Sequence, residues 1–169
     1  MSISETLKYK AKVTQIDLGI KREEMGHIVQ NLSTILASTY TLYVKTHGFH
    51  WNVVGPHFFS LHKLCEEHYR DLWEAVDALA ERIRALGHLA PISSACYQKF
   101  SRIEEEKEIR EAGDMIKQLI IDHELISSLL KEGFVITDKA RDFATADLYV
   151  QRLHFHDKAA WMLRATLGQ

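Results

Sequence analysis

Apolar residues recur every three or four positions along most of this chain, which is the spacing of α-helices that bury one face. Pro56 suits a first helical turn and Gly87 a helix end, while Ser101 and Glu104 have the spacing of a capping box. No alternating pattern of useful strand length competes. The sequence therefore predicts an all-α four-helix bundle whose helices cover residues 21–49, 56–87, 101–136 and 144–167.

Two segments fall outside this pattern. The connection at residues 88–100 contains Pro91 and has room for a short extra helix. Residues 1–21 precede the first helix, and we expect them to form a flexible basic arm in front of one bundle domain at residues 22–169. Five basic and two acidic side chains give residues 1–22 a net charge of +3, although the whole chain is −2. Such an arm can contact phosphate groups or remain in solvent.

Composition narrows the class of protein. Eight Gly and two Pro among 169 residues are few helix breakers, and the length suits one domain. A hydrophobic share of 46% excludes a disordered chain, and no apolar run approaches the roughly 18 residues of a membrane helix. The opening residues resemble no export signal, and the isolated Cys65 and Cys96 form no disulfide framework. We therefore expect a cytoplasmic protein with no membrane partner.

Ten histidines suggest ligand chemistry, and the second predicted helix carries two polar pairs beside its apolar stripe. His62 with Glu66, and Asp77 with Glu81, are each four residues apart and so lie on neighbouring turns. Imidazole nitrogen and carboxylate oxygen together suit ferrous iron, manganese or zinc. Glu66 and Asp77, however, are separated along the helix by about 16 Å at a rise of 1.5 Å per residue, which is too far for one metal centre.

One site can use both pairs only if two antiparallel copies of this helix meet across a two-fold axis, each copy supplying one pair to each site. His50, in the turn after the first helix, would then approach His62 from the side. Taken alone, each pair is more often a solvated surface pair, and Trp51 is more often a packing residue. The residues themselves leave two interpretations open: an oligomeric bundle with an interfacial metal site, and one without.

Three longer motifs resemble one known family. They are HWNVVGPHFFSLH at residues 50–62, DALAERIRALG at 77–87 and TADLYVQRLHFHDKAAWMLRATL at 145–167. Together they closely resemble the Dps family, the DNA-binding proteins from starved cells or mini-ferritins, which belong to the ferritin-like superfamily. The resemblance covers residues 22–168. It implies a ferritin-like four-helix bundle with a short extra helix in the long connection between helices two and three.

The resemblance implies a set of iron ligands. In the family, a ferroxidase centre lies at the two-fold interface between subunits. Carried over to this chain, His50, His62 and Glu66 come from one subunit. Asp77 and Glu81 come from the neighbouring subunit. The family usually has Asp where Glu66 stands, so this ligand is one methylene longer.

The resemblance also implies an activity. Family members form a hollow shell of twelve subunits, oxidise Fe(II) at the interface, preferably with hydrogen peroxide, and store the ferric product as a mineral. Consuming iron and peroxide together suppresses hydroxyl-radical chemistry and protects DNA. Trp51 stands beside His50 and is implied to lie next to the centre, where it either packs or donates an electron.

Two further sets of residues follow from the family. Iron enters the shell through acidic pores near the start of the last helix, which implicates Asp138, Asp142 and Asp147, although Asp142 also suits a helix cap. DNA binding varies with the arms of family members and has no base-reading module here, so we expect it to be salt-sensitive, without sequence preference and associated with the nucleoid. The candidate phosphate contacts are Lys8, Lys10, Lys12, Lys21 and Arg22.

Two rival functions remain at this point. The first is a non-specific DNA-compacting or interaction protein with a vestigial metal site. The second is another redox enzyme on a ferritin-like bundle, such as a manganese catalase. That enzyme needs its full ligand set within one subunit, built from two Glu-x-x-His motifs, and only Glu24 with His27 matches here. The intact set of five candidate ligands favours ferroxidase activity over both.

Overall fold

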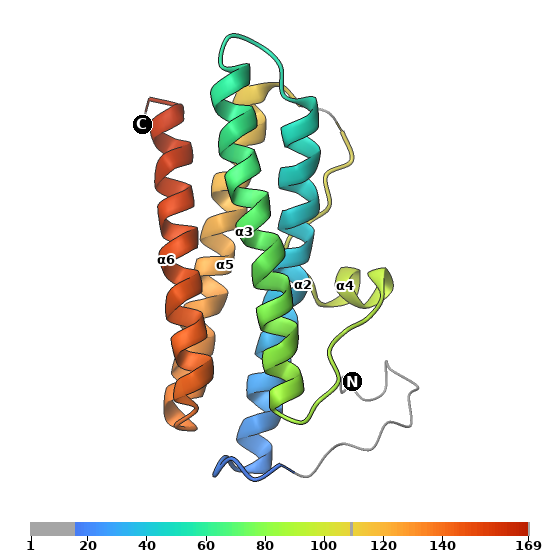
Figure 1. Cartoon of the computed structure of the whole chain (residues 1–169), viewed down its shortest axis with the longest axis vertical. Coiled ribbons are helices and arrows are strands. Elements are labelled where there is room, and N and C mark those ends of the chain that lie inside the picture. Colours follow the sequence, from blue (N-terminus) through green and yellow to red (C-terminus); the bar gives the residue numbers. More distant parts are fainter. Residues whose placement is uncertain (1–15, 109, 169) are drawn as a thin grey trace.

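The structure, a computed structural model, describes residues 16–108 and 110–168. The four long helices run side by side along one axis, and the short α4 projects beside α2 (Figure 1). The described residues include no strand. The prediction of an all-α bundle with an extra helix between the second and third long helices is therefore confirmed. The helices are α2 (Arg22–Asn52), α3 (Phe58–Ala85), α4 (Ser94–Phe100), α5 (Ala112–Lys139) and α6 (Phe143–Thr166).

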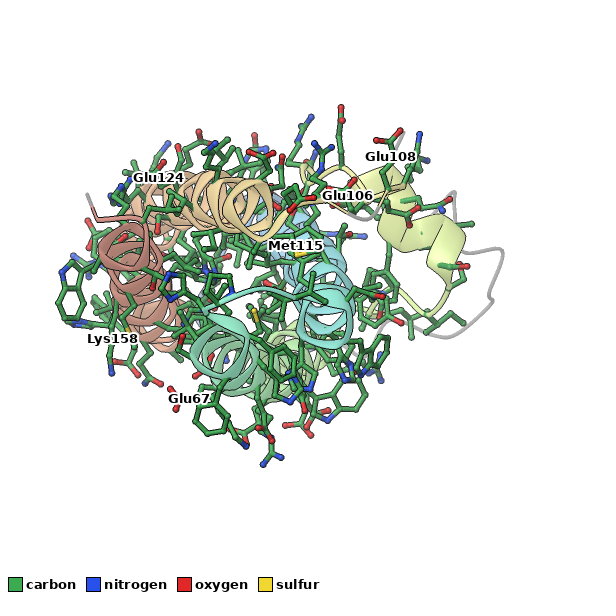
Figure 2. The ribbon with its side chains drawn as sticks, turned by 90° about the horizontal axis from the view of Figure 1, so that it is seen from above. Glu67, Glu106, Glu108, Met115, Glu124 and Lys158 are labelled. Atoms are coloured by element: carbon green, nitrogen blue, oxygen red, sulfur yellow. The ribbon has the colours of Figure 1, made fainter. Side chains whose placement is uncertain are left out.

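One hydrophobic core holds the long helices together. Helix α2 packs mainly against α3, α5 packs mainly against α6, and contacts between α2 and α5 join the two pairs. Leu32, Leu72, Leu79 and Ile126 are fully buried, and each such side chain stabilises the fold by about 1.5–3 kcal/mol. Seen down the bundle in Figure 2, charged side chains such as Glu67 point outward. No helix among the described residues is long and apolar enough to cross a membrane.

The predicted start of the third long helix was wrong. Helix α5 begins at Ala112, and Ser101 is the C-cap of α4 and does not start a helix. The Ser101 hydroxyl instead accepts a hydrogen bond from the backbone N–H of Ile103 and donates one to the carbonyl of the same residue. Ile103 is buried, which anchors the connection between α4 and α5 to the core. Most other residues of this connection are polar and would form no apolar helical face, so the non-helical path loses no further contact with the core.

The turn between α5 and α6 is shorter than predicted and is tied to α3. Asp142 is the N-cap of α6, and its carboxylate accepts the backbone N–H of Thr145 at 3.1 Å. The same carboxylate accepts a hydrogen bond from Arg82 of α3 at 2.6 Å. The prediction that Asp142 caps the last helix is confirmed. The Arg82 contact adds a link that fixes one end of α3 against the start of α6.

Candidate metal centre

His50 and His62 form a close pair at the junction of α2 and α3. His50 lies in the last turn of α2 and His62 in the second turn of α3, and Gly55 reverses the chain between them with a positive φ of 111°. The two rings stack with centroids 3.7 Å apart and an interplanar angle of 21°. His50 is buried and His62 half-buried. The structure therefore brings together two of the five predicted ligands within one chain.

Reciprocal hydrogen bonds orient these two rings. The Nδ1 of His50 lies 2.8 Å from the carbonyl oxygen of His62, and the Nδ1 of His62 lies 2.9 Å from the carbonyl oxygen of His50. A carbonyl oxygen only accepts, so each Nδ1 must carry the proton. The Nε2 lone pair of each neutral ring is then available to a metal. Metal-ligating histidines commonly have this arrangement, with the second nitrogen fixed by a carbonyl.

Glu66 lies one helical turn after His62, and two cations of its own helix hold its carboxylate. Lys63 donates at 2.7 Å and Arg70 at 2.5 Å. The hydrogen bond from Lys63 and the charges of Lys63, Arg70 and His50 hold the pKa of Glu66 below its usual value. The group is therefore a carboxylate at neutral pH. A metal at this position has to compete with the Lys63 ammonium and the Arg70 guanidinium for the same oxygens.

Asp77 and Glu81 lie far from the histidine pair. Helix α3 is continuous between Phe58 and Ala85, so Asp77 follows Glu66 by about 16 Å along the axis. Both side chains are exposed. No group of three or more His, Cys, Asp or Glu side chains in residues 16–108 and 110–168 of the single chain is arranged to hold a metal ion. One chain thus carries two predicted half-sites, His50 with His62 and Glu66, and Asp77 with Glu81, which lie apart along α3 as the helical rise predicted.

Aromatic side chains surround the histidine pair. Tyr69 meets the His50 ring edge-on, with centroids 5.1 Å apart. His47 stacks on Tyr69 at 4.1 Å and lies 4.1 Å from Trp51. Burial, with a smaller effect of the neighbouring His50, lowers the pKa of His47. Trp51 itself is 66% exposed, so in the single chain it is a surface residue beside the centre.

A second histidine cluster lies inside the bundle, and the sequence analysis missed it. His68 of α3, His123 of α5 and His156 of α6 are all buried. The Nδ1 atoms of His123 and His156 lie 2.9 Å apart. Burial lowers the pKa of His68 to about 4 and the pKa of the other two well below the usual value. On a helical wheel of α3, His68 falls at the edge of the apolar stripe, and this position was a signal in the sequence that its side chain is buried.

The remaining candidates are the predicted pore residues, around the turn between α5 and α6, and the predicted phosphate contacts, at or before the start of α2. Asp138 and Asp147 are exposed, whereas Asp142 is buried and bonded to Arg82 and Thr145. The pore role of these three residues stays a prediction. Among the candidate phosphate contacts, exposed Lys21 and Arg22 stand at the start of α2, and Lys8, Lys10 and Lys12 lie outside the described residues.

Several known proteins are similar to this chain in sequence and in fold. A family model described as a ferritin-like domain matches residues 29–169. An uncharacterized low temperature-induced protein of Nostoc sp. is 38% identical over 153 residues, covering 89% of this chain and 86% of that protein. DNA protection during starvation protein 2 of Bacillus anthracis is 35% identical over 142 residues, covering 84% of this chain and 97% of that protein. The crystal structure of a Dps protein from Vibrio cholerae O1 has a TM-score of 0.86 at 28% identity, covering 94% and 99% of the two chains.

The bundle, its short α4 and the match over residues 29–169 define a protein of the ferritin-like class. The Vibrio cholerae protein is described as a member of a superfamily of ferritin-like diiron-carboxylate proteins. Within that class this chain belongs to the Dps family of mini-ferritins, as its motifs indicated.

Proposed function

We propose that the protein is a ferroxidase that oxidises Fe(II) at an inter-subunit centre and stores the ferric product. The observation that supports this most strongly is the His50–His62 pair, whose Nδ1 atoms are both fixed on carbonyl oxygens and whose Nε2 atoms are left for a ligand. The Glu66 carboxylate follows on the next turn. Nitrogen and carboxylate ligands of this kind bind iron and leave coordination positions open to an oxidant.

Two subunits complete each centre. An antiparallel pair of α3 helices places Asp77 and Glu81 of one subunit opposite His50, His62 and Glu66 of the other, and the two-fold axis generates two identical sites. The separation of the half-sites along one continuous helix supports this arrangement. The larger assembly that we propose is the hollow shell of twelve subunits typical of the family, which supplies the volume for mineral.

Hydrogen peroxide is the proposed oxidant. Two ferrous ions supply the two electrons that cleave the oxygen–oxygen bond: 2 Fe²⁺ + H₂O₂ + 2 H⁺ give 2 Fe³⁺ + 2 H₂O. The protein holds both electron donors beside one acceptor, so that no single-electron step releases hydroxyl radical. Removing iron and peroxide together protects DNA.

Since both cysteines are free and buried and the named relatives are bacterial, we propose a bacterial cytoplasmic setting.

Iron entry and DNA contact are two further parts of this proposal. We assign the acidic entry pore to Asp138 and Asp147, which are exposed, while Asp142 lies in the turn between the two helices that carry them. A ring of such carboxylates around a three-fold axis attracts cations.

We also propose non-specific DNA binding by the basic arm, to which the exposed Lys21 and Arg22 contribute. Multiple copies on one shell increase the avidity, and salt weakens it.

Stopped-flow absorbance tests the ferroxidase directly. Metal-free protein is mixed anaerobically with Fe(II) and then with hydrogen peroxide, with a spin trap present. We expect fast ferric formation at about two irons per peroxide without hydroxyl radical, since each peroxide accepts two electrons. The His62→Ala/Asp77→Ala variant should lose this rate, while His154→Ala, which removes an exposed histidine of α6, should keep it. A wild-type rate equal to that of buffer would leave a DNA-compacting protein with a vestigial site as the better assignment.

A further inference from the structure

A continuous row of aromatic rings leads away from the histidine pair. Starting at His50, the ring centroids are separated by 5.1 Å to Tyr69, 6.4 Å from Tyr69 to Tyr43, 6.1 Å from Tyr43 to Tyr40, and 4.5 Å from Tyr40 to Tyr97. The row crosses from α3 to α2 and ends on α4. Tyr40 and Tyr43 are neighbours on one face of α2, while Tyr69 and Tyr97 come from other helices, so tertiary packing joins the row at both of its ends.

We propose that this row, Tyr69–Tyr43–Tyr40–Tyr97, is an electron relay that supplies the second electron to peroxide when a centre holds a single ferrous ion. The inference rests on the proposed ferroxidase function and extends it. A centre with one iron has only one electron for a two-electron acceptor, and without another donor the reaction releases hydroxyl radical. The relay gives the centre a defined second donor.

The electron count closes with tyrosine as the donor: H₂O₂ + Fe²⁺ + Tyr–OH + H⁺ give Fe³⁺ + Tyr–O• + 2 H₂O. The oxygen–oxygen bond of the peroxide breaks, and each oxygen leaves as water. Iron and tyrosine each lose one electron. The phenol proton and one proton from solvent join the two hydrogens of the peroxide in the water formed. A one-electron reductant from solution, with a proton, returns the tyrosine to its resting state.

Tyr69 is the first donor of the relay, in preference to Trp51. Among the ring contacts of the described residues, Tyr69 meets His50, whereas the Trp51 ring contacts His47. His47 lies 4.1 Å from Tyr69 but 6.0 Å from His50, so the closer ring contact from Trp51 toward the centre also passes through Tyr69. Trp73 branches from the row at Tyr43, with centroids 5.4 Å apart.

The far end of the row is suited to hold the oxidised state away from the centre. Tyr40 and Tyr97 are stacked with an interplanar angle of 18°, and Tyr97 donates a hydrogen bond to the carbonyl of Pro91 at 3.2 Å. Rings stacked this closely can exchange an electron, so either tyrosine can carry the neutral radical. Both tyrosines also line an open pocket of about 480 Å³ beside α4. A small reductant can therefore reach the final pair without entering the metal centre.

The test uses the full-length assembled protein loaded anaerobically with one Fe(II) per subunit. Peroxide is added, samples are freeze-quenched for electron paramagnetic resonance, and ferric absorbance and a hydroxyl-radical spin trap are read in parallel. Tyr69→Phe keeps the ring that stacks on His47 but cannot form a phenoxyl radical. The Tyr40→Phe/Tyr97→Phe variant interrupts only the far end. Trp161→Phe removes an oxidisable ring that is 64% exposed on α6 and outside the row.

In the wild type we expect a tyrosyl radical and little trapped hydroxyl radical. Tyr69→Phe should lose most of the tyrosyl signal and release more hydroxyl radical, Tyr40→Phe/Tyr97→Phe should move the radical to a tyrosine with a different hyperfine pattern, and Trp161→Phe should match the wild type. Ferric formation without any protein radical, or an equal radical yield in Tyr69→Phe, overturns the relay alone. Absence of ferric formation in the wild type overturns the proposed ferroxidase and the relay with it.

Discussion

At the scale of single residues, Glu66 is the proposed ligand whose surroundings compete most directly with a metal. Its carboxylate is the only predicted ligand of the first half-site that carries a negative charge, and Lys63 and Arg70 already occupy its oxygens. At the proposed centre, iron therefore has to compete with these two side chains, each of which lies within about one helical turn of Glu66.

Arg70→Gln should tighten metal binding, because it removes a cation that lies 2.5 Å from the Glu66 carboxylate. Exposed ion pairs are weak, so we expect an increase in affinity of about fivefold or less. Calorimetric titration with Co(II) under anaerobic conditions measures it. Lys117→Gln, which breaks an exposed pair with Asp114 on α5, is the matched control. Unchanged or weaker Co(II) binding in Arg70→Gln would show that the pair does not compete with the metal.

The buried histidines make stability depend on pH. The pKa of His68, His123 and His156 is lowered in the folded protein, so the unfolded chain binds more protons once the pH falls below about 6.5. Stability is therefore complete above that pH and is lost as the pH falls toward about 4. Each histidine contributes up to about 1.4 kcal/mol per pH unit in this window.

Guanidinium unfolding midpoints measured between pH 7.5 and 5 test this dependence. We expect the midpoint to fall steeply below pH 6.5, and to fall less steeply in His68→Leu because one proton fewer is taken up on unfolding. His154→Leu removes an exposed histidine of α6 and should keep the wild-type slope. A midpoint that is flat over this range would contradict the neutral buried cluster.

At the scale of elements, helix ends position the chemistry. The junction between α2 and α3 places the two proposed ligand histidines side by side, and the junction between α5 and α6 places Asp142 against Arg82. Asp142 and Asp147 were predicted for the same pore, yet the first is buried and bonded while the second is exposed. These two acids should therefore respond differently to substitution.

Asp142→Ala should destabilise the protein by about 3–5 kcal/mol, because it removes the cap of α6 and leaves the partly buried Arg82 without its carboxylate partner. Asp147→Ala should change stability by no more than about 0.5 kcal/mol and instead slow iron uptake by the assembled shell. Thermal unfolding and ferric absorbance, measured on both variants, separate the two roles. Equal iron uptake in Asp147→Ala and wild type would remove Asp147 from the pore.

At the scale of the whole molecule, the proposed sharing of each centre between two subunits makes activity a property of the subunit pair. A dimer of one His62→Ala subunit with one Asp77→Ala subunit has both lesions in one site and leaves the other site intact. Random mixing makes half of the dimers mixed, so an equal mixture should recover about a quarter of the wild-type activity while each variant alone has none. Co-refolding followed by the peroxide assay measures this. A mixture as inactive as its components would mean that no site is shared between subunits.

The sequence by itself determined the bundle and the candidate ligands. Helical periodicity and i, i+4 spacing are local properties, so they predicted α3, its two polar pairs and the distance between them before any packing was known. The start of α5 was mispredicted because Ser101 and Glu104 fit a capping box equally well in a chain that continues without a helix.

Only the tertiary structure decided how side chains from different helices meet. The reciprocal bonds between His50 and His62, the buried cluster around His123, and the aromatic row that ends at Tyr97 all join residues of different helices. The hydrophobic period along one helix predicts which of its faces is buried. It does not predict which residue of another helix lies opposite that face. Axial register and rotation between helices set those pairings, and they depend on the packing of the complete core.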